Sequence, residues 1–317
     1  MIAALRTRLG AAPWVWSFVG AIAAWVATLV AAHGQGVGQI LTAAFTFSSF
    51  TVLVSLGQML VITTGPGNVD LSIPSVIALA GAVAMLVMNE RADMVLPGLL
   101  AAVAAGAVVG VANYGLIRLL RIPPIIATLS SSLIVTSVAI TVGRGLKIKP
   151  PQAFADAVSA KLAGVPLLAV AALALAALVA FALERTVYGR TVSAIGQSRR
   201  VARLAGLAVE RTRLVTYGLS GALAGLCGAL IAGYSGGNSL DQGNEYLLLT
   251  IAVVVIGGTA VSGGRASVPG VWGAALFMFL VVTMLNAAGT APGLRTLLTG
   301  LIIIAVIVVG GGEKPQR

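Results

Sequence analysis

Long apolar runs separated by short polar segments dominate the pattern of this chain. Two clear examples are Leu167–Leu183 and Val271–Gly293, neither of which contains a charged residue. Uncharged runs of about 18 residues or more indicate helices that cross a membrane. Ten spans fit the pattern, at 13–32, 41–63, 72–88, 95–117, 123–143, 164–183, 213–234, 246–262, 267–288 and 293–309. The sequence therefore predicts an all-α fold, a polytopic transmembrane helical bundle of about ten spans in a single domain, 1–317.

Two segments, 63–75 and 256–270, interrupt this helical pattern. The first contains Gly-Pro-Gly at 65–67, which does not continue a helix comfortably. It then brings Asn68, Asp70 and Ser72 close to membrane depth. The second has glycines at 257, 258, 263 and 264. We therefore expect broken or re-entrant backbone at both places. Irregular backbone at membrane depth normally lines a cavity.

The two interrupted segments also resemble each other. The sequence SIPSV at 72–76 parallels SVPGV at 267–271, and each precedes an apolar span that ends in asparagine, Asn89 or Asn286. Both following spans run in the same direction in a ten-span topology. The pattern gives the hypothesis of two halves repeated in parallel, while small apolar residues can also match by chance.

A basic segment of about thirty residues, 184–213, separates two apolar spans. It holds seven of the twenty Lys and Arg residues, namely Arg185, Arg190, Arg199, Arg200, Arg203, Arg211 and Arg213. Short basic loops are retained on the cytoplasmic side. With both termini placed there, fourteen of the twenty cationic residues face the cytoplasm. The sequence therefore predicts a multi-pass membrane protein with both ends cytoplasmic.

Within this segment, residues 198–207 (SRRVARLAGL) predict a short helix. Ser198 suits its N-cap and Gly206 its C-terminal cap. Helical spacing gathers Arg199, Arg200 and Arg203 on one side and Val201, Leu204 and Ala205 on the other. Two interpretations remain open. The helix could lie at the membrane surface with its arginines at lipid phosphates, or it could be a rigid knob that seats in a cytoplasmic protein.

Composition narrows the function. Hydrophobic residues make up 58% of the chain and charged residues 9%, against about 25% charged residues in soluble domains. The net charge of +11 follows from the cytoplasmic loops, so we expect membrane lipid and no nucleic acid as a partner. The chain has no G-x-x-x-x-G-K-[ST] phosphate loop, one histidine and one cysteine. These absences argue against ATP hydrolysis, a zinc site or a hydrolase, and we expect no enzymatic activity, no catalytic residue, no metal and no cofactor.

Four segments resemble a known family. They are 69–72 (VDLS), 121–129 (RIPPIIATL), 188–207 (with YGR, AIG and ARLAGL) and 256–270 (IGGTAVSGGRASVPG). In this order they resemble the G-G-I-D-L-S-V-G-S stretch, the P-P-F-I-A-T-L stretch, the cytoplasmic coupling loop and the G-G-T-S-x-x-G-G-x-G-S stretch of ribose-type ABC importer permeases. Order and spacing agree from about residue 55 to 290.

Two departures accompany this resemblance. The family's first glycine pair and isoleucine read Gly67-Asn68-Val69, and its V-G-S reads Ile73-Pro74-Ser75. The acidic N-E-E of the coupling loop reads QSRR at 197–200. The first departure lies in a region that could line the solute path, and the second implies a partner cleft of different charge.

The resemblance implies a permease subunit, in the bacterial inner membrane, of an importer that carries a monosaccharide or a related small polar solute. Its implied partners are ATP-binding subunits, a second permease copy or paralogue, and a periplasmic solute-binding protein. The short cytoplasmic helix is then a coupling helix that docks on the ATP-binding subunit. The residues expected to make this contact are Arg190, Ser198, Arg199, Arg200, Val201, Arg203, Leu204 and Gly206.

Six polar residues are candidates for the translocation path, namely Asn68, Asp70, Ser72, Asn113, Thr128 and Asn286. The alternative for each is a hydrogen bond between packed helices, which is common for polar residues in membrane bundles. Asp70 is also the one acidic residue near membrane depth outside a plain loop, so an ion-gradient-driven transporter that works alone is the second hypothesis. A structural membrane protein without a path is the third.

Overall fold

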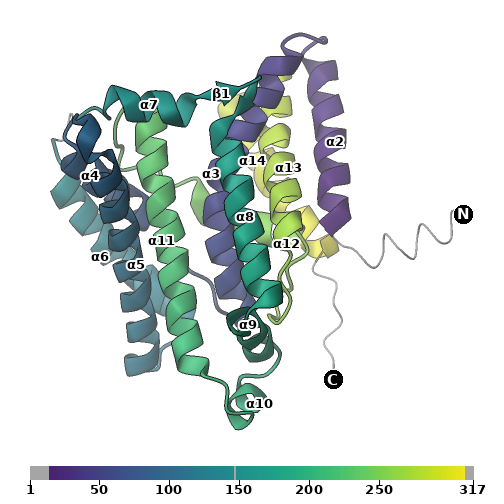
Figure 1. The fold of residues 1–317 in the computed structure, drawn as a ribbon. Coiled ribbons are helices and arrows are strands. Elements are labelled where there is room, and N and C mark those ends of the chain that lie inside the picture. Colours follow the sequence, from purple (N-terminus) through teal and green to yellow (C-terminus); the bar gives the residue numbers. More distant parts are fainter. Residues whose placement is uncertain (1–13, 146–147, 311–317) are drawn as a thin grey trace, which may run out of the picture.

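A computed structural model describes residues 14–145 and 148–310 as a helical bundle (Figure 1). Arg6, Arg8, Lys147, Lys314 and Arg317, which entered the charge count above, lie outside the described residues. The helices are α2 (Trp14–Ala31), α3 (Val37–Thr63), α4 (Ile73–Met88), η1 (Ala92–Met94), α5 (Val95–Leu120), α6 (Pro124–Gly143), α7 (Gln152–Ser159), α8 (Leu167–Arg185), α9 (Val187–Gln197), α10 (Arg199–Leu204), α11 (Val209–Ser235), α12 (Tyr246–Ile256), α13 (Val268–Ala287) and α14 (Pro292–Gly310).

The predicted all-α class is confirmed. Of the described residues, only Lys161–Leu162 (β1) and Val165–Pro166 (β2) form strands, which pair antiparallel as a small hairpin. Within residues 14–145 and 148–310, seven helices are long and apolar enough to cross a membrane. Three shorter apolar helices, α4, α12 and α14, coincide with the three remaining expected spans. The structure therefore supports a polytopic bundle, while the count of ten spans stays a prediction.

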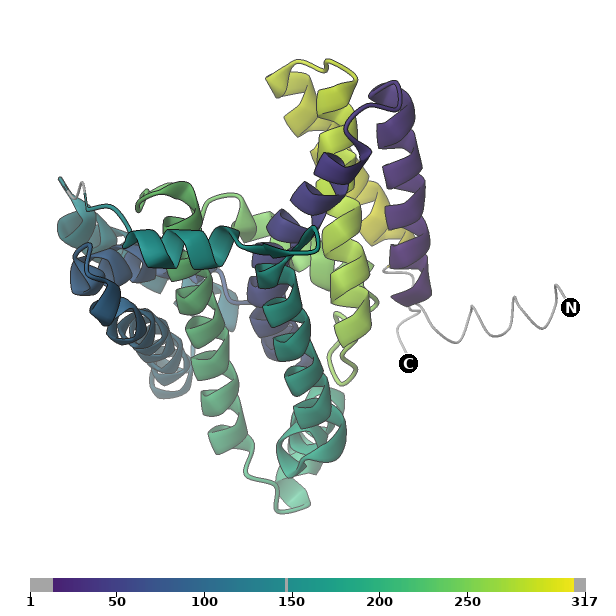
Figure 2. The ribbon, with the colours of Figure 1, turned by 45° about the horizontal axis from the view of Figure 1, so that its top comes forward.

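The short helices mark the two ends of the bundle. In Figure 1, α7 lies across one end, and α10 projects from the opposite end below α9 and α11. Phe154 and Val158 of α7 are buried against the bundle, so this helix covers the ends of the long helices. In Figure 2 the yellow C-terminal helices lie beside α2, on the side away from α4, α5 and α6.

Helices α5 and α11 approach each other through glycines. A methyl group on Gly106 would lie 2.0 Å from the carbonyl oxygen of Gly221, and one on Gly110 would lie 2.0 Å from the carbonyl oxygen of Tyr217. Neither position has room for a side chain, because the backbone of the partner helix occupies it. Small residues spaced four apart allow this close packing in membranes, where lipid leaves little hydrophobic drive for association.

Both predicted interruptions are present, and they lie side by side. Helix α3 ends at Thr63 and α4 begins at Ile73, while α12 ends at Ile256 and α13 begins at Val268. The backbone N–H of Gly264 donates to the carbonyl oxygen of Thr63 at 2.9 Å. Each following helix carries a proline in its first turn, which the missing proline N–H permits.

The basic segment 184–213 is helical over most of its length. Arg185 ends α8, Arg211 and Arg213 belong to α11, and α9 and α10 fill the space between. Gly196, near the end of α9, packs against both interruptions, because a methyl group there would lie 2.1 Å from Gly264 N and 2.1 Å from Thr63 O. The segment that carries α10 therefore contacts both broken regions of the bundle directly.

Candidate functional site

Asp70 is the centre of a buried polar network in the first interruption. Its side chain is 2% exposed. One carboxylate oxygen accepts hydrogen bonds from the backbone N–H and the hydroxyl of Ser72, at 3.0 and 2.6 Å. The other accepts one from the hydroxyl of Ser220 on α11, at 3.1 Å. Three donors satisfy this carboxylate, as a buried polar group requires.

The network continues onto α5 and α6. The amide of Asn113 donates to the Ser72 hydroxyl at 2.7 Å, and the Ser131 hydroxyl donates to the Asn113 carbonyl oxygen. Thr128 accepts from the backbone N–H of Leu71 at 3.0 Å. Sequence reasoning thus selected residues that meet in space: Asn68, Asp70, Ser72, Asn113 and Thr128 are all buried around the same interruption.

Asn286 lies apart from these five residues. It is exposed near the C-terminal end of α13, where the Arg295 side chain donates to its carbonyl oxygen. Helix α13 leads away from the interruption that precedes it, so its last turn lies at the far end of the span. The structure does not bring Asn286 to the network around Asp70.

The capped helix predicted at 198–207 is confirmed as α10. The Ser198 hydroxyl accepts the backbone N–H of Val201 at 3.3 Å, as an N-cap does. At the other end Gly206 has φ of +75°, Leu207 N donates to Ala202 O at 3.1 Å, and Gly206 N donates to Arg203 O at 3.1 Å. This is the Schellman arrangement, which satisfies the last carbonyl groups of a helix.

The buried face of α10 is neither the basic face nor the apolar face that helical spacing predicted. Ala202 is the buried residue and packs with Ile195 and Val209. Val201 and Leu204 are 62% and 80% exposed at the end of the bundle. An exposed apolar pair on a short, rigid, doubly capped helix is suited to contact with another protein.

Glu210 ties the arginines of α10 to the bundle. Its Oε1 accepts from Arg199 Nη2 at 3.0 Å and from Arg203 Nη2 at 2.7 Å. Its Oε2 accepts from the hydroxyl of Tyr114 on α5. Two of the arginines expected to dock on a partner are therefore held within the chain. The remaining residues expected at this contact, Arg190 and Arg200, are exposed on α9 and α10.

Arg213 extends this connection to the first interruption. Only 4% of it is exposed. Its guanidinium lies 5.2 Å from the ring centre of Tyr114 and donates to Asn68 Oδ1 at 2.7 Å. Asn68 in turn donates to the carbonyl oxygen of Gly65 at 3.0 Å. Charged and polar contacts thus run without interruption from α10 through Glu210, Tyr114 and Arg213 to the backbone of the break.

A further tyrosine fastens α9 to α11. The hydroxyl of Tyr188 lies 2.9 Å from the hydroxyl of Thr216. Burial raises the pKa of the Tyr188 phenol, so this side chain stays neutral and remains a hydrogen-bond donor throughout the physiological pH range. Together with Gly196, this contact fixes α9 against the long helices.

A mixed polar and apolar pocket of about 540 Å³ lies between α4, α6 and the loop 236–245. Its polar side chains are Ser75, Ser132, Thr136, Asp241 and Asn244. Sequence reasoning named none of them as a path candidate, although it placed the segment that contains Ser75 in a region that could line the path. The available signals were the hydroxyls four residues apart on α6 and the amide- and carboxylate-rich loop after Gly236.

The loop 236–245 folds back against α4. The Gln242 amide donates to the carbonyl oxygens of Ile77 and Gly228, at 3.3 and 3.4 Å. A methyl group on Gly243 would lie 2.2 Å from Pro74 O. This loop therefore packs onto the start of α4, next to the network around Asp70, and brings Asp241 and Asn244 to the pocket.

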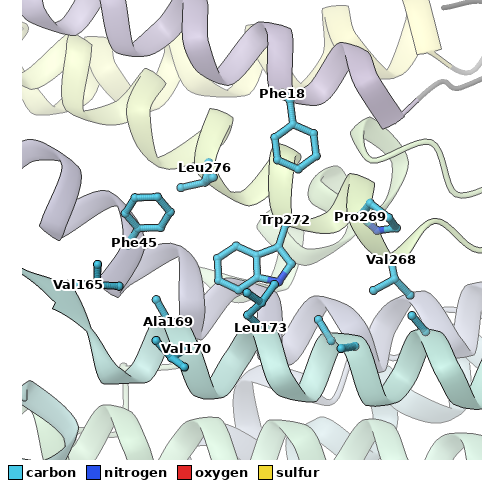
Figure 3. A pocket seen from close by; sticks show the side chains of 13 residues that line it. Phe18, Phe45, Val165, Ala169, Val170, Leu173, Val268, Pro269, Trp272 and Leu276 are labelled. Atoms are coloured by element: carbon cyan, nitrogen blue, oxygen red, sulfur yellow. The ribbon is translucent and has the colours of Figure 1, made fainter. Parts of the chain in front are cut away.

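A second cavity of about 440 Å³ lies between α2, α3, α8 and α13. Figure 3 shows Phe18, Phe45 and Trp272 around it, with aliphatic side chains completing the wall. A sugar-like solute needs several hydrogen-bond partners when it leaves water, and this lining does not provide them. Among the described residues, no cluster of three His, Cys, Asp or Glu side chains could hold a metal ion.

Comparison with known families gives one match over most of the chain. Residues 40–307 match the family described as the branched-chain amino acid transport system / permease component. This range includes every candidate site residue described above. No solved structure gives a significant match.

Individual relatives agree with this match. The chain is 30% identical over 325 residues to the probable ABC transporter permease protein y4mJ of Sinorhizobium fredii, covering 100% of this chain and 93% of that protein. It is 29% identical over 272 residues to the autoinducer 2 import system permease protein LsrD of Salmonella typhi, with 83% and 81% covered. LsrD of Escherichia coli is 28% identical over 271 residues, with 83% and 82% covered.

Proposed function

The chain belongs to the family of branched-chain amino acid transport system permease components, and from that premise we propose that it forms the solute path of an ATP-binding-cassette importer. It is a multi-pass membrane subunit and not itself an enzyme. ATP hydrolysis belongs to separate ATP-binding subunits that dock at the end of the bundle that carries α10. In this proposal that end and both termini face the cytoplasm.

The observation that carries this proposal is the position of α10. It is the outermost helix at its end of the bundle (Figure 1). It is capped at both ends, and it exposes Val201 and Leu204. Gly196 and Glu210 connect it to the two interruptions and to α5. Movement of a docked ATP-binding subunit would therefore reach the interruptions through packed groups.

We place the solute path along the pocket between α4, α6 and the loop 236–245. Its hydroxyls, Asn244 and the Asp241 carboxylate are groups that recognise the hydroxyls of a small polar solute. Thr136 and Asp241 are exposed in the single chain. A second permease copy or paralogue facing α6 would enclose them. The network around Asp70 then serves as the inner wall, because Leu71, Pro74 and Ser75 line the pocket directly next to it.

The solute class follows from the relatives and from this lining. Two relatives are named for import of autoinducer 2, and the pocket offers hydroxyl, amide and carboxylate groups. We propose a monosaccharide or a similar polyhydroxylated molecule, delivered from outside by a periplasmic solute-binding protein. The parallel half-repeat suggested by the two proline-led helices α4 and α13 remains part of this proposal.

Reconstitution tests the proposal. The chain is placed in liposomes with its ATP-binding and solute-binding partners, and uptake of labelled monosaccharides is measured with ATP and, separately, with a proton or sodium gradient alone. ATP-dependent uptake that falls when Asp241 is replaced by Ala supports the path. Uptake by the isolated chain on an ion gradient contradicts it and favours the ion-driven alternative.

A further inference from the structure

A cationic cleft lies beside α10, separate from the solute pocket. It has a volume of about 970 Å³ and opens between the C-terminal end of α5, the N-terminal end of α6 and α10. Six arginines line it, namely Arg118, Arg121, Arg199, Arg200, Arg203 and Arg213. Glu210 is the single acidic side chain among the described residues of its lining. The lining therefore carries a large excess of positive charge.

The contacts inside the chain leave this charge mostly uncompensated. Glu210 accepts from Arg199 and Arg203, and Arg118 lies 3.9 Å from it. Within the described part of the chain, no salt bridge reaches Arg121 or Arg200. Cations of one sign gathered in one cleft repel each other, and a bound anion removes that repulsion. Guanidinium groups favour phosphate, which they bind through paired hydrogen bonds.

The surroundings of the cleft are strongly apolar. Exposed hydrocarbon side chains extend from it along α5, with Leu119 at 80% and Val108 at 67%. Residues 108 and 119 are three turns apart and share one face of α5. Helix α5 is part of a candidate membrane span, so in a membrane this surface would face hydrocarbon.

We propose that this cleft binds the phosphate headgroup of an anionic phospholipid, with its acyl chains lying along α5. A ligand with one anionic end and two hydrocarbon tails matches both parts of the surface at once. A water-soluble partner protein would match the arginines but not the apolar face of a spanning helix. The bound lipid joins α10 to the ends of α5 and α6, so it stiffens the part of the chain on which an ATP-binding subunit would dock. Basic pockets between membrane helices at this depth are suited to such headgroups.

Native mass spectrometry of the purified full-length chain tests this proposal. Phosphatidylglycerol and phosphatidylcholine with identical acyl chains are titrated separately, and the chain should retain phosphatidylglycerol more tightly. The double variant Arg121→Gln, Arg200→Gln should bind it about thirtyfold more weakly, because each arginine near an anionic surface contributes roughly a fivefold factor. Arg185→Gln is the matched control, since Arg185 is exposed at the end of α8 outside the cleft.

Several results would overturn the proposal. Equal binding of the two lipids would show that the cleft does not recognise headgroup charge. Equal loss in the double variant and the Arg185 control would show charge attraction without a site. Binding of inorganic phosphate as tight as that of the lipid would assign the cleft to a free anion. Unchanged lipid binding in the double variant, with loss of the co-purified ATP-binding subunit, would assign it to protein docking.

Two further measurements keep the test independent of folding and of transport. The far-ultraviolet circular dichroism of each variant shows whether the bundle is intact. Raising the salt from 0.1 to 1 M shortens the screening length from about 10 to 3 Å, so phosphatidylglycerol binding by the native chain should weaken. Lipid binding needs neither solute nor ATP, so its failure would leave the proposed transport function untouched.

Discussion

Gly196 is the position at which a single methyl group should separate α10 from the bundle. In Gly196→Ala the new Cβ would lie 2.1 Å from Gly264 N, 2.1 Å from Thr63 O and 2.6 Å from Gly264 Cα. Ordinary contacts begin near 3.4 Å, so backbone must move by more than 1 Å at both interruptions. Overpacking of this kind costs about 1–3 kcal/mol. The hydrogen bond from Gly264 N to Thr63 O, now 2.9 Å, would also break, at a further cost of about 1 kcal/mol.

We expect Gly196→Ala to reduce solute uptake per hydrolysed ATP by at least fivefold, because about 1 kcal/mol or more is removed from the contact between α9 and the interruptions. Uptake and phosphate release are measured together in liposomes that hold the complete transporter. Gly115→Ala on α5 is the control, since a methyl group there meets nothing within 4 Å. Native coupling in Gly196→Ala, with the backbone contact intact in a solved structure, would refute the reasoning.

Three further changes test other parts of the structure. Glu210→Gln removes the negative charge that Arg199 and Arg203 share. We expect a loss of about 1 kcal/mol or less in stability, because ion pairs between exposed side chains contribute little. Coupling in the same uptake assay should weaken, and unchanged coupling would count against the connection. Gly206→Pro cannot adopt the φ of +75° at the end of α10, so the ATP-binding subunit should no longer co-purify although circular dichroism stays native. Asp70→Ala leaves two serine hydroxyls and one backbone N–H without their acceptor. The free energy of unfolding in detergent should therefore fall by about 2–4 kcal/mol. Asp70→Asn should retain ATP-driven uptake, and loss of uptake in a stable Asp70→Asn variant would favour an ion-coupled role.

Features set by local chemistry could be predicted from the sequence. The apolar spans follow from the absence of water in a bilayer, which leaves helices as the way to satisfy backbone groups. The interruptions follow from glycine and proline at 65–67 and from the glycines after Ile256. The caps of α10 follow from Ser198 and Gly206, whose preferences act over a few residues.

Features set by contacts between distant residues could not be predicted. The sequence assigns Arg213 to the charges of the cytoplasmic loop. Its side chain is nevertheless buried and donates a hydrogen bond to Asn68, which lies 145 residues away. The return of the loop 236–245 to α4 depends on Gly243 fitting against Pro74, and no periodicity encodes that contact. Helical spacing alone predicted the two faces of α10. In the structure Ala202 is the buried residue, because α9 and α11 cover that side of the helix.

The glycine contact between α5 and α11 has a mechanical consequence. With backbone touching backbone at Gly106 and Gly110, the two helices have almost no freedom to slide and should swing as one lever. Helix α11 has 27 residues, which makes it about 40 Å long. A tilt of about 5° at the end that holds Glu210 would then displace the far end by about 3–4 Å. A small displacement of these two helices on one side of the membrane would then widen a passage on the other side.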